Sequence, residues 1–455
     1  MLTLIILAGL GVARPAAAGH VLRGVDDPRL FRERADPADL HEVGVTLRAD
    51  VIRCDIAWSL AEPRRGSYDD EYLDEVAATI VAARELDVQV VVLVYRTPEW
   101  ASDRSLWSRP VKGDRAGVYH SYYPPAKKSL ADFQAFAGHL ATRLKGTVLA
   151  YEPWCEPNMF RYLFPQRTAR YADFAARRYR HMLRAFAAGV RAADPTALVC
   201  AGATAPFGRD DRYGTSPQRF ARQLRTLGAA SLFDVYTHHP YVPGGTRNVA
   251  PEAQPRDPGR TVSLGNLPTL LRIFPRKPFY MTEFGWSTHP SSTFGVWVST
   301  VQQATYLRRA FAYLERFPQV KLGIWFPLKD TSHTGGYGDR WGVYSGLRRL
   351  DGTRKRAYYA FAGGNTLLLE APQTVASRAA FTLRGSLASV TMGPLGGKVL
   401  DVETRRTGGD WRKVRQVTTR PDGTYAVNVR ASVSSDWRVR WRGVTGSRIN
   451  RVAVR

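Results

Sequence analysis

Short apolar runs alternate with amphipathic stretches over most of the chain, from about residue 20 to residue 363. This strand-then-helix pattern occurs eight times when a first strand near residues 20–25 is included. The predicted strands lie at residues 20–25, 51–56, 88–95, 147–154, 197–202, 233–239, 278–284 and 320–326. Because repeated strand–helix units form parallel sheets covered by helices, and eight units close on themselves, the pattern predicts a (β/α)8 TIM barrel.

Helical repeats of apolar residues separate these strands. They are clearest at residues 68–86, 129–144 and 174–193, and weaker ones occur near 217–228, 265–273, 300–316 and 354–363. Ser129 begins one of these helices and belongs to a residue type that caps helix N-termini, so we expect its side chain to cap this helix. In such a barrel the carboxyl ends of the strands build the active site, so functional residues are expected there.

The pattern changes near residue 365. Beyond it the chain consists of short alternating runs separated by turn sequences such as GG (396–397, 408–409) and PDG (421–423), with no helical repeat. These runs predict a small all-β sandwich of the immunoglobulin or fibronectin kind. We therefore expect a barrel at residues 19–365 and a sandwich docked on it at residues 366–455. Of Trp411, Trp437 and Trp441, two are expected in the sandwich core.

The first residues are typical of an export signal. Residues 2–13 are apolar and Ala16 and Ala18 fit a small-residue cleavage pattern, so we interpret residues 1–18 as a signal peptide and the protein as secreted. A buried N-terminal strand is the alternative. The apolar run is too short to cross a bilayer, which needs about 20 residues. Three cysteines are too few for a disulfide framework, and Cys54 and Cys200 are predicted to be buried thiols.

The chain is strongly basic, with a net charge of +25. The sandwich region contributes 16 Arg and Lys residues against 6 acidic ones. Such a balance favours an acidic partner, for example an acidic cell-envelope polymer. The basic residues are spread along the chain without a helix-turn-helix, zinc-finger or RNA-binding motif, so nucleic acid is not an expected partner.

Two glutamates follow predicted strands four and seven. Glu156 lies in YEPWCEPN (151–158) and Glu283 in TEFGWST (282–288). Strands four and seven of a barrel can direct side chains across the same mouth. Two carboxyl groups on either side of a sugar ring can cleave a glycosidic bond: one protonates the leaving oxygen and the other attacks the anomeric carbon, with net retention of configuration.

At these motifs the chain resembles the retaining glycoside hydrolases of clan A, which share a (β/α)8 barrel. YEPWCEPN is similar to the pattern that closes strand four in family 39, and TEFGWST is similar to the nucleophile strand of families 39 and 5. The resemblance covers most of residues 20–363. It implies that Glu156 is the acid/base and Glu283 the nucleophile.

Further positions match the same pattern. The resemblance implies that Arg53 supports the nucleophile, that Tyr241 of the His239-Pro-Tyr241 triplet contacts it, and that Trp325 forms a hydrophobic floor for the sugar. A cation beside Glu283 favours its charged form. Loop aromatic residues are also candidates for a sugar groove: Trp100, Trp107, Tyr122, Tyr123, Phe160, Trp286 and Trp341.

Two positions depart from the clan pattern. An asparagine that contacts the substrate 2-hydroxyl normally precedes the acid/base, and here the residue is Cys155, a much weaker hydrogen-bond partner. Tyr95 stands where many members carry a histidine on strand three. Either the substrate lacks the usual equatorial 2-hydroxyl, another residue contacts it, or activity is weak.

Other carboxylates and histidines have plainer interpretations. Glu152 lies one period below Glu156 and is expected to pair with a buried cation, for which Arg53 is a candidate. His238 and His239 lack the spacing of a metal site, so neither a metal nor a cofactor is expected. The sequence thus predicts a secreted retaining glycoside hydrolase whose substrate is a polysaccharide or oligosaccharide. A β-linked polysaccharide is the favoured substrate, and endo action is favoured over exo action. The alternative is a non-catalytic carbohydrate-binding or cell-wall-associated barrel.

Overall fold

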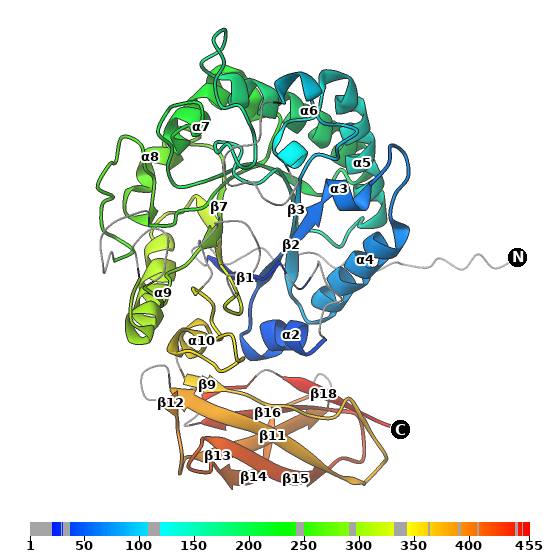
Figure 1. Ribbon diagram of the computed structural model, residues 1–455. Coiled ribbons are helices and arrows are strands. Elements are labelled where there is room, and N and C mark those ends of the chain that lie inside the picture. The colour runs from blue at the N-terminus through cyan, green and yellow to red at the C-terminus, as the bar shows by residue number, and fades with distance from the viewer. Residues whose placement is uncertain are drawn as a thin grey trace, which may run out of the picture.

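The larger part of the molecule is a closed barrel of eight parallel strands, as the sequence predicted (Figure 1). The computed structural model describes residues 21–28, 30, 37–107, 119–242, 250–290, 297–331, 344–362, 365–389, 393–406, 409–441, 445–447 and 449–455, so the expected signal peptide lies outside the described residues. The barrel strands are β1 (Leu22–Asp26), β2 (Val51–Ala57), β3 (Gln89–Tyr95), β4 (Ala150–Pro153), β5 (Leu198–Thr204), β6 (Val235–His238), β7 (Phe279–Phe284) and β8 (Val320–Trp325).

The barrel closes where β1 pairs with β8. Gly24 on β1 lies opposite Val51 on one side and Ile324 on the other. A Cβ atom at Gly24 would lie 2.8 Å from Cγ1 of Ile324 and 3.0 Å from the carbonyl oxygen of Val51. Glycine therefore permits the close approach that seals the sheet.

Helices surround the barrel. The α-helices are α2 (Pro37–His41), α3 (Trp58–Ala61), α4 (Asp70–Glu85), α5 (Leu130–Arg143), α6 (Phe174–Ala193), α7 (Pro217–Thr226), α8 (Pro268–Leu271), α9 (Thr300–Leu314) and α10 (Arg356–Phe361). A π-helix, η1 (Glu42–Thr46), and 3₁₀ turns accompany them, the latter being η2 (Arg104–Leu106), η3 (Tyr119–Tyr122), η4 (Lys127–Ser129), η5 (Ala229–Ser231) and η6 (Leu264–Asn266).

The start of α5 differs from the sequence prediction. Ser129 stands at the helix start, but its side chain makes no capping hydrogen bond. The 3₁₀ turn η4 leads directly into the helix, and the Ser129 side chain is buried. The preceding turn therefore continues into α5, where the sequence had indicated a side-chain cap.

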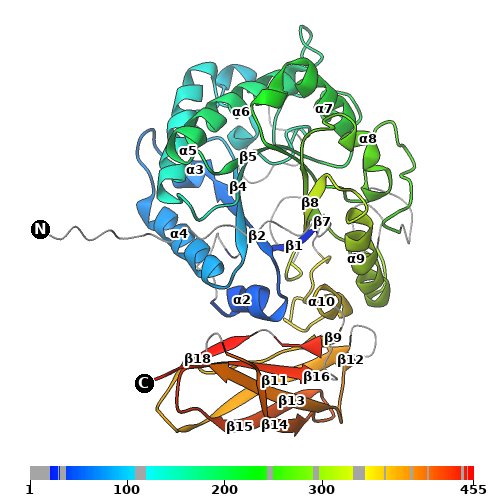
Figure 2. The ribbon, with the colours of Figure 1, turned by 180° about the vertical axis from the view of Figure 1, so that it is seen from behind.

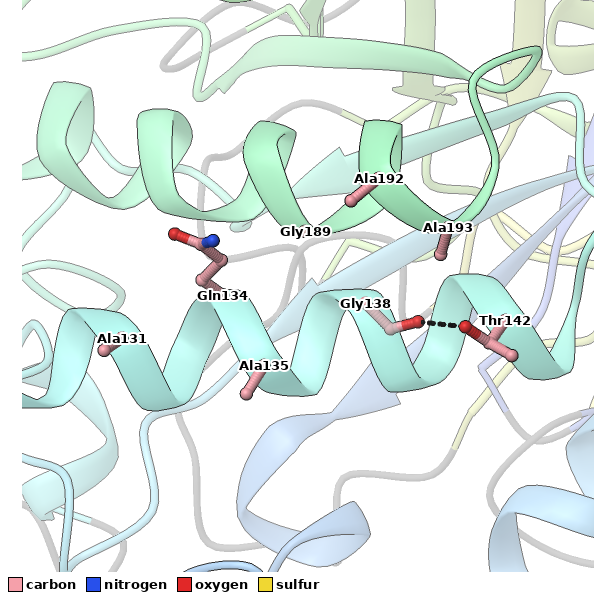
Figure 3. Close-up of a pocket in the computed structure, with 8 residues that line it drawn as sticks. All are labelled: Ala131, Gln134, Ala135, Gly138, Thr142, Gly189, Ala192 and Ala193. Atoms are coloured by element: carbon pink, nitrogen blue, oxygen red, sulfur yellow. Dashed lines mark hydrogen bonds between the residues drawn. The ribbon is translucent and has the colours of Figure 1, made fainter.

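Helices α5 and α6 pack unusually closely. Gly138 and Gly189 face each other, and a Cβ at Gly189 would lie 2.2 Å from the carbonyl oxygen of Gln134. A shallow groove runs between the two helices on the outside of the barrel (Figure 3), and its lining is mostly small: Ala131, Gln134, Ala135, Gly138, Thr142, Gly189, Ala192 and Ala193.

The C-terminal region consists of two sheets, as expected for a sandwich. One sheet has the order β10-β18-β16-β13-β14, with β17 beside β16, and the other has the order β12-β11-β15, with β9 beside β11. The strands are β9 (Asn365–Leu367), β10 (Thr374–Val375), β11 (Ala380–Ser389), β12 (Gly393–Pro394), β13 (Val399–Arg406), β14 (Arg412–Thr418), β15 (Thr424–Arg430), β16 (Ser435–Trp441), β17 (Thr445–Gly446) and β18 (Asn450–Val454).

The sandwich has its own apolar core, in which Trp437 is buried and Trp441 partly buried. Trp411 is instead covered by the guanidinium groups of Arg405 and Arg438. Two of the three tryptophans therefore belong to the core, as the sequence predicted. Both views show the sandwich beside α2 and α10 of the barrel (Figures 1 and 2). At this contact Arg48 donates a hydrogen bond of 3.3 Å to the carbonyl oxygen of Leu367.

The three cysteines are buried and form no disulfide, which confirms the prediction for Cys54 and Cys200. Within the described ranges, no helix has both the length and the apolar character that a membrane span requires.

Candidate active site

The barrel interior is layered. Near the amino ends of the strands the inward-facing side chains are apolar, and they are Val51, Val91, Ala150, Cys200, Val235, Tyr280, Leu322 and Ile324. Two residues further along, Arg53 on β2 and Glu152 on β4 are fully buried. Because alternate residues of a strand share a face, both side chains lie above the apolar layer, toward the carboxyl ends of the strands.

Arg53 is the centre of a buried ionic network. Its Nη2 lies 2.8 Å from Oε2 of Glu152, and its Nη1 lies 3.1 Å from Oδ2 of Asp26, which ends β1. Thr282 donates a 3.0 Å hydrogen bond to the other oxygen of Glu152. These contacts confirm that Glu152 pairs with a buried cation.

The contacts within this network shift the pKa values of its members. Burial disfavours the charge of Arg53, but Glu152 and Glu283 outweigh this and raise the pKa of Arg53 well above its usual value. Burial and the nearby Asp55 carboxylate raise the pKa of Asp26. Arg53 therefore remains the fixed cation among several acidic groups.

Glu283 lies on β7 and contacts Arg53 directly. Nη1 of Arg53 is 2.5 Å from Oε1 of Glu283. In a regular strand Thr282 and Glu283 would point to opposite faces. The pairing of β7 with β8 shifts register between Met281 and Phe284, and this irregularity lets both side chains reach the barrel interior.

Tyr241 holds the second oxygen of Glu283. Its hydroxyl donates a 3.1 Å hydrogen bond to Oε2 of Glu283. Burial and the charge of Glu283 raise the pKa of Tyr241 well above its usual value, so the phenol stays protonated and acts as a donor. The contacts predicted for Arg53 and Tyr241 are therefore both present.

Glu156 follows β4 in a constrained segment. Its backbone has a φ of 40°, and its amide donates a 2.9 Å hydrogen bond to the carbonyl oxygen of Ala203, itself at a φ of 42°. Asn158 fastens the segment because its side chain accepts from the amide of Ala205 and donates to the carbonyl oxygen of Thr215. Such left-handed conformations are unfavourable without glycine and occur often at functional sites.

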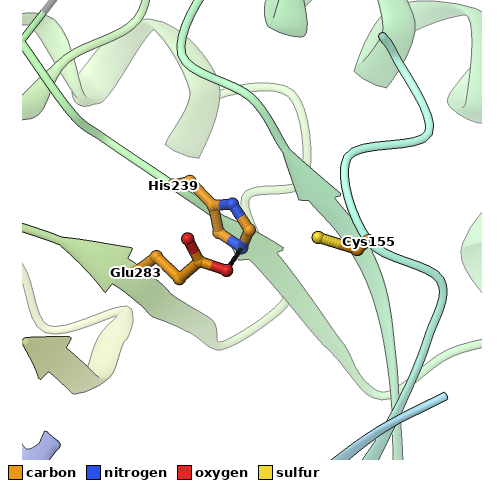
Figure 4. Close-up of side chains that lie close together, drawn as sticks. All are labelled: Cys155, His239 and Glu283. Atoms are coloured by element: carbon orange, nitrogen blue, oxygen red, sulfur yellow. Dashed lines mark ion pairs between the residues drawn. The ribbon is translucent and has the colours of Figure 1, made fainter. Parts of the chain in front are cut away.

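His239 lies between the two glutamates. Its Nδ1 is 3.0 Å from Oε1 of Glu156. Its Nε2 is 3.6 Å from Oε1 of Glu283 (Figure 4). Burial and the charge of Arg53 lower the pKa of His239 well below its usual value, so the imidazole is neutral near pH 7. In the neutral tautomer that carries its proton on Nδ1, this nitrogen donates the hydrogen bond to the Glu156 carboxylate.

Solvent exposure separates the carboxylates into two groups. The side chains of Asp26 and Glu152 are 0% exposed, whereas those of Glu156 and Glu283 are 20% and 15% exposed. A ligand entering the mouth can therefore reach Glu156 and Glu283 but not the carboxylates beneath them. Glu152 has the geometry of a supporting residue.

Trp325 does not lie where its predicted role requires. Its indole is fully buried, packs against Phe284 and Trp286, and donates to the carbonyl oxygen of Ser345. Leu322 and Ile324 face the interior, so the alternation of β8 turns Trp325 toward the surrounding helices. The prediction that Trp325 forms a floor for a sugar is therefore wrong in this structure.

Cys155 faces the interior immediately before Glu156. It is 6% exposed and packs with Ala57, Leu93 and Tyr95. Burial and the charge of Glu283 raise the pKa of its thiol well above the usual value. The two departures from the clan pattern, Cys155 and Tyr95, are therefore neighbours in space.

The loop aromatic residues are distributed between the core and the surface. Tyr123 and Trp286 are buried, and Trp100 contacts Trp58 in the layer outside the barrel. Half-buried positions are held by Trp100, Trp107, Tyr122 and Phe160. Trp341 lies outside the described residues. Among the described members of this set, only the half-buried residues keep the exposure that stacking on a sugar requires.

Sequence reasoning missed two residues at the site. Asp26 contacts Arg53 from the end of β1, and its position directly after the strand predicted at residues 20–25 was the available signal. Tyr213 is 42% exposed and lies edge-to-face with Phe160 at a centroid distance of 5.5 Å. It belongs to the loop after β5, and only the folded chain brings it beside the segment after Glu156.

Several solved protein structures are similar in fold to this chain. The sequence matches no protein-family model and no curated protein. A family 39 glycoside hydrolase from the gut symbiont Bacteroides cellulosilyticus WH2 is similar in structure, with 15% identity, a TM-score of 0.52 and coverage of 93% of this chain and 81% of its own.

Two further solved structures are similar at the same level. The β-glycosidase BGL167 has 15% identity and a TM-score of 0.51, over 76% of this chain and 96% of its own. A GH5_18 protein from Streptomyces cattleya, in complex with Manb1-4GlcNAc, has 17% identity and a TM-score of 0.51, over 75% of this chain and 79% of its own. At these identities the likeness establishes the barrel fold that the family resemblance implied.

Proposed function

We propose that the protein is a retaining glycoside hydrolase that cleaves a β-linked glycan with Glu156 and Glu283. The observation that carries the proposal is that these two partly exposed carboxylates flank one imidazole, His239, at the mouth of the barrel. Deeper carboxylates are closed to solvent, and Arg53 and Tyr241 hold both oxygens of Glu283.

The reaction takes place in two displacements. In the first, the Glu283 carboxylate attacks the anomeric carbon while protonated Glu156 gives its proton to the departing glycosidic oxygen, and a glycosyl ester forms on Glu283. In the second, the Glu156 carboxylate takes a proton from water as the water attacks the anomeric carbon. The ester bond breaks, Glu283 returns to its carboxylate form, and the sugar keeps its configuration.

Supporting side chains orient this chemistry. Arg53 and Tyr241 hold Glu283 in one orientation. His239 contacts Glu156 through Nδ1 and so fixes the carboxyl that must give and take a proton. Holding the reacting groups in a fixed orientation accounts for a large part of the rate enhancement of many enzymes.

Glycan hydrolysis tests the proposal. Wild type is incubated with β-glucans, mannans, xylans and bacterial exopolysaccharides, and reducing ends are measured beside the Glu283→Gln variant. The sandwich variant Glu403→Gln is the control, because Glu403 pairs with Arg438 far from the mouth. Release that disappears only in Glu283→Gln supports the proposal, and nuclear magnetic resonance of the first anomer formed tests retention. Product sizes separate endo from exo action.

A second candidate function is sugar binding without cleavage. It is favoured by Cys155 at the position of an amide and by the burial of Trp325 away from the site. If wild type and Glu283→Gln bind the same glycan with equal affinity and neither releases reducing ends, the binding function is the correct one.

The proposal extends to export and to an acidic partner. The apolar N-terminal run supports secretion, and the net charge of +25 supports attraction to an acidic envelope polymer. N-terminal sequencing of protein from the culture medium tests cleavage after residue 18. Binding to an acidic polysaccharide is expected to weaken as salt increases, since salt screens exposed charges.

A further inference from the structure

Three potential metal ligands converge beside the proposed nucleophile. Cys155, His239 and Glu283 each present one ligand atom, and these atoms lie within 4.8 Å of one another. Figure 4 shows the Cys155 sulfur directed toward the His239 imidazole, with Glu283 on its other side. The residues come from three different strand ends, so only the closed barrel brings them together.

His239 has an unused nitrogen at this point. With the shared proton on Nδ1, the imidazole donates to Glu156 and its Nε2 carries a lone pair. Among the described residues this buried Nε2 has no hydrogen-bond partner. It faces Oε1 of Glu283 at 3.6 Å, so two electron-pair donors lie opposite each other.

This arrangement matches the surroundings of known metal ligands. A histidine that binds a metal usually donates its other N–H to a carboxylate, which fixes the tautomer and the ring orientation. In the tautomer with the proton on Nδ1, Glu156 fulfils that part for His239. Zinc takes tetrahedral sulfur, nitrogen and oxygen ligands at about 2.0–2.3 Å, which places ligand atoms roughly 3.3–3.8 Å apart. The Nε2 to Oε1 distance of 3.6 Å lies within that range.

We propose that Cys155, His239 and Glu283 bind one divalent transition-metal ion of the zinc type. The ion takes Sγ of Cys155, Nε2 of His239 and a carboxylate oxygen of Glu283, with a fourth position open toward the mouth. Binding converts the thiol to a thiolate and releases one proton to solvent. An ion held there occupies the oxygen that would attack the sugar, so it inhibits hydrolysis. The inhibition, unlike the binding, rests on the proposed function.

Metal binding is tested on the full chain without a histidine tag. Protein freed of metal is titrated with Zn²⁺ by calorimetry and with Co²⁺ by absorption spectroscopy, because a cobalt–thiolate bond gives a charge-transfer band in the near ultraviolet. One equivalent of metal and this band are expected for wild type. In Cys155→Ala the band disappears and the Zn²⁺ dissociation constant rises by more than about 10-fold. Cys155→Ser is a second variant in case Cys155→Ala is not folded.

The matched control is Cys54→Ala. Cys54 is also a buried strand cysteine, but it packs in the layer outside the barrel. Its variant is expected to keep the band, the affinity and any glycan hydrolysis. The inference is overturned if folded wild type binds no metal, or if Cys155→Ala and wild type bind with equal affinity, which would indicate an adventitious surface ion.

The outcomes for metal binding and for hydrolysis are independent. If wild type shows the cobalt band but cleaves no glycan, the metal site is supported and the proposed function is rejected. If wild type cleaves glycan and saturating Zn²⁺ does not inhibit it, the proposed function is supported and the metal site is rejected.

Discussion

The two domains place their charged side chains in opposite ways. The barrel buries Arg53, Asp26 and Glu152 completely. In the sandwich Leu400, Val402 and Val439 are fully buried, whereas the charged side chains of β13 and β16 keep some exposure: Asp436 is 8% exposed and the ion pair between Arg438 and Glu403 stays partly exposed. A buried ionic network costs desolvation that an apolar core avoids. Among the described residues a fully exposure-free ionic network of this kind occurs in the barrel and not in the sandwich, which favours the barrel mouth as the functional region.

The largest expected effect comes from removing the buried cation. Arg53→Met leaves Glu152 and Asp26 without their counter-charge, so we expect the free energy of unfolding to fall by about 3–5 kcal/mol. Denaturant unfolding measures it. The control, Arg438→Met in the sandwich, removes a partly exposed pair and should cost about 1 kcal/mol or less. Equal losses in the two variants would contradict the contrast between the domains.

The next effect tests whether the sandwich has an independent core. Trp437 is 2% exposed, so Trp437→Ala should cost about 3–5 kcal/mol through lost contacts and a cavity. We expect proteolysis of the sandwich at temperatures at which the barrel is resistant. Trp411→Ala, on the outer face, should cost about 1 kcal/mol or less. Simultaneous loss of both domains in Trp437→Ala would show that the two cores unfold together.

A third effect depends on pH. Burial lowers the pKa of His238 to about 4, with Nδ1 bonded to Thr204 and Nε2 to the carbonyl oxygen of Val262. Between pH 6.5 and pH 4 the unfolded chain binds this proton and the folded chain does not, so stability falls as pH falls. At about 1.4 kcal/mol per pKa unit, acidification from pH 7 to pH 4 should destabilise wild type by roughly 3 kcal/mol more than His238→Gln. Unfolding curves at the two pH values measure this difference, and parallel losses would contradict it.

The smallest expected effect comes from removing the single hydrogen bond between Tyr241 and Glu283. Tyr241→Phe removes the donor to Glu283 while keeping the ring, so the barrier should rise by about 1.5 kcal/mol, roughly a 10-fold loss in kcat/KM. Stability should change little. Steady-state kinetics on the substrate found in the glycan panel measures the loss. An unchanged kcat/KM would mean that this hydrogen bond does not assist the nucleophile.

Much of the fold followed from periodicity. Strand runs and helical repeats predicted the eight-stranded barrel, and the change to short alternating runs predicted the sandwich. The sequence prediction failed where the capping preference of one residue was overridden by the neighbouring turn. Ser129 is a good capping residue, yet η4 runs into α5 and its side chain makes no cap.

The candidate site was predictable in part. Glu156 and Glu283 were found because motifs at strand ends are local in sequence, and the contacts of Arg53 and Tyr241 followed from the family resemblance. Trp325 was misplaced, because the family resemblance implied a sugar platform while the alternation of β8 directs it outward. Neither Asp26 nor Tyr213 has a motif of its own, so their place at the site depended on the fold.

The sequence by itself determined the barrel, the sandwich and the two glutamates, because hydrophobic periodicity and strand-end motifs depend only on neighbouring residues. Tertiary structure decided which carboxylates reach solvent and which are closed beneath them. It also brought Cys155 to His239 and Glu283. Barrel closure and the register shift in β7 set these distances, and both arise from contacts between residues far apart in the chain.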